Sequence, residues 1–206
     1  MGSSTILDII GSFVTFGVLF LMALRLNAST SESSSAYYEN YLLQSNLTTI
    51  VTILEDDFSK IGYCADPSKI NPASLAMRYA DTSRIRFWTD IDNNGTVDSI
   101  EYYIGPLSEL SDTPNPRDRY LYRKINNQDP YRIYVGLTQF RFQYRRPDDE
   151  QIIPFPITNP QTIGLIELSI ALESASPRKQ EYMQDSSQYQ IFWKQIRLTS
   201  KNLKYR

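Results

Sequence analysis

A short acidic segment, residues 90–101, has the residue types and spacing of a calcium-binding loop. Oxygen-bearing side chains recur at its first, third and fifth positions, Gly95 stands sixth, and an acid closes it at the twelfth. Alternate spacing turns short carboxylates inward toward a cation, and a glycine at the sixth position allows the sharp bend of the loop. The predicted ligands are Asp90, Asp92, Asn94, Thr96 through its backbone carbonyl, Asp98 and Glu101.

The segments on either side of this loop favour strands rather than the paired helices of an EF-hand. Residues 84–89 and 100–104 alternate apolar and polar side chains, which is typical of two strands joined by a hairpin. Asp, Asn and Gly are also the residues that tight turns tolerate best. The sequence therefore leaves two interpretations open: a structural calcium site and a metal-free turn.

The composition of the chain argues against an enzyme. None of the 206 residues is a histidine, which removes the commonest general base and the usual transition-metal ligand. The single cysteine, Cys64, excludes an intrachain disulfide framework, and we expect it to be a half-buried small apolar residue. The formal net charge is only −2 and the basic residues are spread along the chain. We therefore expect no catalytic residues, no small-molecule substrate and no nucleic acid partner.

The N-terminus carries one long apolar run with a single acid, Asp8, at its front edge. As a helix, residues 6–26 would span about 30 Å, the thickness of one hydrocarbon core. No Lys or Arg precedes the run, which argues against a cleaved secretory signal, although Ala28-Ser29-Thr30 has the small residues of a cleavage region. Arg25 follows the run, and charge alone would place that end of the helix in the cytoplasm.

Asp8 itself has two interpretations. A carboxylate at the edge of an apolar helix is costly unless it is paired, protonated or within reach of lipid headgroups. Asp8 therefore either lies at the membrane interface without a role, or pairs with an N-terminal amine or another cation when helices pack side by side.

Helical periodicity resumes after a small, polar stretch. Residues 27–36 are either a flexible linker or a weakened part of the same helix. Residues 37–61 form a predicted second helical stretch whose apolar stripe packs on the following sheet, with Gly62 as its stop. The stripe consists of Leu47, Ile50, Val51, Leu54, Phe58 and Ile61. The residues predicted on the opposite side of this helix are Glu55, Asp56, Asp57 and Lys60.

From Met77 onward the hydrophobic period changes to two, which predicts an antiparallel sheet with one packed face and one wet face. The expected strands cover residues 84–89, 100–104, 120–125, 131–135, 139–145, 166–172 and 189–199. The predicted fold class is therefore α+β, with a long N-terminal helix, apolar in its first half and amphipathic in its second, packed on an antiparallel sheet. The predicted segments are a transmembrane or filament-core helix (1–26), a polar segment and amphipathic helix (27–63), and a β-rich domain (64–206).

Four stretches of the chain, in the right order, resemble the type IV pilin superfamily. Residues 5–8, Thr-Ile-Leu-Asp, are similar to the family's Thr-Leu-Ile-Glu stretch and place Asp8 at its glutamate. Residues 54–63 resemble its Leu-x-x-Asp-Leu-Arg-x-Ala-Gly-Tyr helix end. Residues 87–103 are similar to its strand, acidic turn and strand, and residues 136–144 to its Gly-Val-x-x-Leu-x-Phe-x-Tyr strand. The closest resemblance is to minor pilins and the J-type minor pseudopilins of type II secretion.

This resemblance implies a non-enzymatic subunit that anchors in the membrane through residues 6–26. Its N-terminal helix would pack with copies of itself or related pilin-like subunits in a filament or secretion pseudopilus, where Asp8 could set the register. The β domain would be extracytoplasmic, at the cell surface or in the periplasm, or exposed on an extracellular filament for protein contacts.

Two alternatives remain open. One is a single-pass anchored extracytoplasmic binding domain with a structural calcium loop that never polymerises. The other is a component of a large secretion or envelope assembly that only shares this layout.

Overall fold

The structure is a computed structural model that describes residues 2–179, 187–199 and 202. In these residues one α-helix, α1 (Gly2–Ser59), precedes nine strands and three short 3-10 helices. The strands are β1 (Met77–Ala80), β2 (Arg84–Thr89), β3 (Asp98–Ile104), β4 (Arg119–Ile125), β5 (Tyr131–Arg145), β6 (Leu165–Glu173), β7 (Arg178–Lys179), β8 (Ser187–Gln188) and β9 (Ile191–Leu198). The 3-10 helices are η1 (Ala73–Ala76), η2 (Leu107–Leu110) and η3 (Pro160–Thr162).

The polar stretch 27–36 is helical, so α1 runs through it without a linker. Serine and threonine lower helix propensity because their hydroxyls compete for backbone groups, but here they bond to the helix itself. Thr30 Oγ1 donates to the Leu26 carbonyl at 2.8 Å, and Ser35 Oγ to the Ser31 carbonyl at 3.1 Å. The chain divides into two compact units, Met1–Leu42 and Leu43–Arg206, whereas the predicted segments divide at residues 26 and 63.

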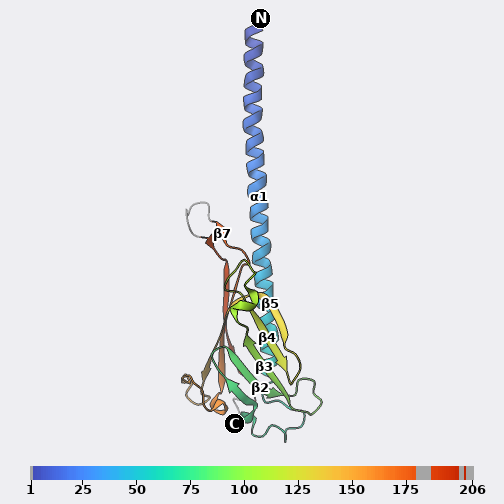
Figure 1. The fold of residues 1–206 in the computed structure, drawn as a ribbon, viewed down its shortest axis with the longest axis vertical. Helices are drawn as coiled ribbons and strands as arrows, with labels where there is room; N and C mark the ends of the chain where they lie inside the picture. Colours follow the sequence, from blue (N-terminus) through green and yellow to red (C-terminus); the bar gives the residue numbers. More distant parts are fainter. Residues whose placement is uncertain (1, 180–186, 200–201, 203–206) are drawn as a thin grey trace. The chain divides into compact units, whose positions relative to one another are not determined.

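The second unit is built on one antiparallel sheet. Its seven strands follow the order β1-β2-β3-β4-β5-β6-β9, and every neighbouring pair is antiparallel. β7 and β8 pair separately as a small ribbon. Figure 1 shows the strands beside the C-terminal part of α1. The α+β class predicted from the sequence, a long N-terminal helix packed on an antiparallel sheet, is confirmed.

Phe58, near the C-terminal end of α1, packs against aromatic side chains of the sheet. It is 1% exposed, and its ring lies 5.2 Å from that of Phe87 in β2 and 6.0 Å from that of Phe142 in β5, between ring centres. Burial of one such side chain contributes about 1.5–3 kcal/mol, so the apolar stripe of the helix is the main attachment. The buried apolar residues of α1 are Leu43, Leu47, Ile50, Val51, Leu54 and Phe58.

One prediction of strand boundaries is wrong, because it divides a single strand into two. Residues 131–135 and 139–145 belong to a single strand, β5, rather than to two. Gly136 has a φ of 73°, a conformation that side chains disfavour, and the register with β6 shifts between Leu137 and Gln139. A Cβ at Gly136 would lie 2.4 Å from the Glu173 carbonyl oxygen. The glycine therefore allows a bulge, and the strand continues past the residues that interrupt the alternation.

The prediction that Asp57 lies on the side of the helix opposite the apolar stripe is also wrong, because Asp57 is buried and only 3% exposed. Arg123 of β4 donates from Nε to Asp57 Oδ2 at 2.7 Å and from Nη2 to Oδ1 at 3.0 Å. The Tyr102 hydroxyl also donates to Oδ2. Burial, and then the Asp57 charge, raises the pKa of Tyr102, which keeps this hydroxyl protonated as a donor. The spacing could have indicated this burial, because Asp57 lies three residues after Leu54 and so on the same side of the helix as the apolar stripe.

Candidate functional site

The first part of α1, residues 6–26, exposes a large apolar surface whose contact with water is unfavourable. Fourteen large apolar side chains between residues 6 and 26 are exposed, from 46% for Val18 to 73% for Phe13. At about 1.5–3 kcal/mol each, full burial would be worth on the order of 20–40 kcal/mol before the cost of ordering. α1 is long and apolar enough to cross a membrane by length and composition. Lipid or other protein around this surface would remove it from water.

The two hydroxyl side chains within this apolar surface, Ser12 and Thr15, bond to the helix itself. Ser12 Oγ donates to the Asp8 carbonyl at 2.8 Å, and Thr15 Oγ1 to the Gly11 carbonyl at the same distance. Hydroxyls bonded in this way need no water, so they can lie in lipid or between helices.

Asp8 differs from these two hydroxyl residues. Its side chain is exposed, and no ion pair joins it to another charged side chain in the described residues. The structure therefore shows, on the exposed apolar part of α1, the single acid that the sequence analysis identified there.

The second candidate site is the acidic loop between β2 and β3. Asp90 is 1% exposed and organises the loop by accepting backbone N–H groups. Its Oδ2 accepts from Ala65 at 3.0 Å and Gly95 at 2.8 Å, and its Oδ1 accepts from Asn94 at 3.0 Å. Burial acts to raise the pKa of Asp90, but these backbone donors outweigh it and lower the pKa. Asp90 therefore stays ionised as the acceptor at the base of the loop.

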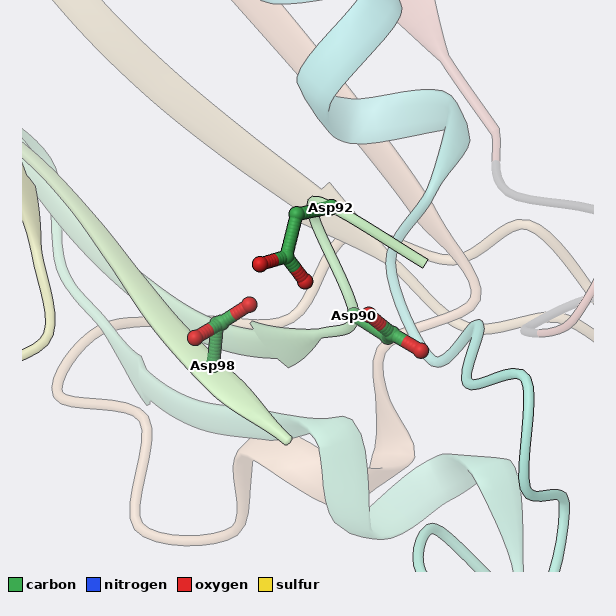
Figure 2. Close-up of side chains that lie close together, drawn as sticks. All are labelled: Asp90, Asp92 and Asp98. Carbon is green, nitrogen blue, oxygen red and sulfur yellow. The ribbon is translucent and has the colours of Figure 1, made fainter. Parts of the chain in front are cut away.

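Three of the six predicted ligands come together. Asp90, Asp92 and Asp98 each offer one carboxylate oxygen, and these atoms lie within 4.8 Å of one another. In Figure 2 the carboxylates of Asp92 and Asp98 are turned toward the space between them. The Asn94 side chain lies beside them, but its Nδ2 donates to Asp92 Oδ2 at 2.8 Å and its Oδ1 accepts the Thr96 N–H at 2.7 Å.

Glu101, the predicted closing ligand, does not lie in this cluster. β3 begins at Asp98, and extended backbone carries Glu101 about 10 Å further along the strand. There it accepts a bond from Arg84 Nε at 2.8 Å. In a helix–loop–helix site the chain would turn back at this position, and the strand prevents that.

The loop therefore fits a calcium ion only in part. Both oxygens of Asp90 are occupied by N–H donors, and Asp98 accepts from Ile91 N at 3.1 Å and Asn126 Nδ2 at 2.7 Å. Ca²⁺ takes about six to eight oxygens, and the three aspartates offer one each, so its remaining ligands would have to be backbone carbonyls or water. Calcium binding stays a prediction, and the hydrogen bonds explain how the turn is held without it.

Two residues that shape this loop, Asn126 and Lys69, were not predicted from the sequence. Asn126 follows β4 directly. Its Nδ2 donates to Asp98 Oδ1 at 2.7 Å, and its Oδ1 accepts the Ser99 N–H at 2.8 Å. Lys69 Nζ donates to the Gly95 carbonyl at 2.7 Å and brings a positive charge to the acidic loop. Both lie more than twenty residues away in sequence from the groups they contact, and no local pattern marks them.

No protein-family model, curated protein or solved structure matches this chain. The resemblance to the type IV pilin superfamily therefore stays a prediction that rests on the four stretches described above.

Proposed function

We propose that this protein is a non-enzymatic pilin-like subunit, a minor pilin or pseudopilin. The first part of α1 holds it in the membrane before assembly and packs with copies of itself or related subunits after assembly. The β domain is extracytoplasmic and makes contacts with other proteins. Asp8 sets the register of the packed helices.

The apolar first part of α1 is the observation that supports this proposal best. Its fourteen exposed apolar side chains surround the whole helix rather than forming one stripe, while the same helix further on buries a stripe under the sheet. A helix that is apolar all round is suited to lipid or to the centre of a helical assembly. A continuous helix that serves both environments is the arrangement that a membrane-stored filament subunit needs.

The second candidate is the anchored domain that never polymerises. It is favoured by the positions of Asp8 and Arg25, which bracket the apolar run at the two levels where lipid headgroups lie. In that case Asp8 needs no protein partner, and its substitution has no effect on association.

Substitution of Asp8 separates these candidates. We expect Asp8→Ala to reduce the share of the full-length chain found in high-mass particles after amine crosslinking of native membranes. Glu32→Ala removes an exposed acid further along α1 and serves as the matched control. Equal particle distributions for wild type and both variants would contradict the pilin-like proposal and support the anchored domain.

A further inference from the structure

Only two charged residues lie in the first thirty positions of the chain, Asp8 and Arg25. They have opposite signs and stand seventeen residues apart, which corresponds to about 25 Å along a helix. Neither has a charged neighbour three or four positions away on the helix. In the described residues, no ion pair joins either of them to another side chain.

Asp8 and Arg25 are stabilised in different ways in lipid and in an assembly of helices. In a membrane each end of the apolar run reaches headgroups, so each charge is solvated separately. When the helix leaves lipid and packs among other helices, both charges lose those headgroups. An unpaired charge in an apolar setting costs several kcal/mol, so each then requires a partner of opposite sign.

We propose that Asp8 of one copy pairs with Arg25 of a second copy that is displaced by about 25 Å along the helix axis. This inference rests on the proposed function, because it names the partner of Asp8 in the assembled state. The guanidinium of Arg25 can hold the carboxylate through two parallel hydrogen bonds, which fixes the register as well as the charge balance.

The arrangement of the two charges also selects the kind of contact. Copies packed side by side without displacement would place Asp8 beside Asp8, which is repulsive. Seventeen residues turn a helix so that Asp8 and Arg25 lie about 100° apart around its axis. Each copy therefore uses one surface for the copy below and another for the copy above. Such a heterologous contact cannot close into a ring, because each copy is displaced along the helix axis. It continues instead into an open filament.

Two serines make this register measurable without removal of the charges. Ser12 and Ser29 are exposed, follow Asp8 and Arg25 by four residues, and face one another in the proposed pair. Cysteines at both positions, in a Cys64→Ser background, should form disulfides between copies when native membranes and assembled material are oxidised. No disulfide can form within one chain, since the two positions are about 25 Å apart on one helix.

We expect the chain with Ser12→Cys and Ser29→Cys to give a ladder of covalent dimers, trimers and larger species. Either cysteine alone should give no ladder. Addition of Asp8→Asn or Arg25→Gln to the double-cysteine chain should lower the crosslinked fraction about tenfold, as expected for loss of a close charge pair.

Three results would overturn the pairing. One is a ladder that survives both charge neutralisations. Another is a dimer from Ser12→Cys alone, which would indicate helices without displacement. A third is crosslinking of Ser12→Cys with Leu21→Cys instead of Ser29→Cys, which would indicate antiparallel helices. If high-mass particles form without the ladder, the pairing fails and the proposed function stands; if neither appears, both fail.

Discussion

Asp118 is only 1% exposed, yet one of its two carboxylate oxygens has no hydrogen-bond donor in the described residues. The Tyr134 hydroxyl donates to Oδ2 at 3.0 Å, and Oδ1 is left without a partner. Burial raises the pKa of Asp118, and the nearby Glu173 charge adds to this, against the opposing effects of Tyr134 and Arg117. Burial also raises the pKa of Tyr134 to about 12, so its hydroxyl stays a donor at neutral pH.

We expect Asp118→Asn to stabilise the protein at pH 7. The folded state holds the Asp118 proton more tightly than the unfolded state, so the free energy of unfolding falls as pH rises from about 4 through the folded pKa. Replacement of the ionised group by an amide should raise the free energy of unfolding by about 1 kcal/mol at pH 7. The gain should shrink toward pH 4, where Asp118 of the wild type is protonated. Chemical denaturation at several pH values measures this difference.

Asp129 provides the matched control, because it is an exposed acid in the turn between β4 and β5. Asp129→Asn should leave the free energy of unfolding within about 0.5 kcal/mol of the wild type at every pH. A loss of stability in Asp118→Asn at pH 7, or a gain that does not depend on pH, would refute this account of Asp118.

The candidate sites show what residue patterns can and cannot predict. The acidic spacing correctly indicated a cluster of Asp90, Asp92 and Asp98, because short turns bring alternate residues together. The structure places Glu101 outside this cluster, since the twelfth position depends on whether a helix or a strand follows the loop. The acidic spacing had no means of indicating Asn126, whose contact with Asp98 depends on strand pairing.

At the scale of elements, the contact between α1 and the sheet depends on a polar link as well as on apolar packing. We expect Asp57→Ala to lower the free energy of unfolding by about 3 kcal/mol, because Arg123 and Tyr102 would lose a buried acceptor. For a domain of this size, that corresponds to a fall in Tm of roughly 6–12 °C. Thermal and chemical denaturation of the full chain in detergent measure the change.

Asp56 is the adjacent control for this experiment. Its side chain is 61% exposed and pairs with Lys60 at 2.7 Å, so Asp56→Ala should cost no more than about 0.5 kcal/mol. Similar losses for the two variants would show that the buried link does not hold the helix to the sheet.

Calcium binding by the loop between β2 and β3 has its own test. If the ion binds, millimolar Ca²⁺ should raise the Tm of the wild type, and Asp92→Ala should abolish the rise. In EDTA, Asp92→Ala should melt close to the wild type, because the backbone bonds of Asp90 remain in place. Asp129→Ala should keep the calcium effect. A wild type that melts at the same temperature with and without calcium would favour the metal-free turn.

The elements themselves were largely predictable from periodicity. The helical stripe and the alternating runs correspond to α1 and to strands of the observed sheet, because burial on one side imposes both periods. Two features depended on contacts that no local pattern contains: the bulge that unites β5 at Gly136, and the partner that allows Asp57 to be buried.

At the scale of the whole molecule, the chain combines a β domain that buries its own core with a helical unit whose apolar side chains are exposed in the described residues. The core of the second unit is drawn from α1 beyond residue 42, from the sheet and from the segments that connect them, and among the described residues it includes none of the first unit. The apolar surface of the first unit is therefore available for lipid or for other subunits, and the proposed assembly uses both in turn.

Electron micrographs of native material, labelled with antibody against the β domain, test this proposal most directly. We predict label along or at the tips of filaments or short pilus-like particles, and loss of that label in Asp8→Ala. Label confined to membranes as separate single chains, with the same distribution in wild type and Asp8→Ala, would contradict the proposed pilin-like function.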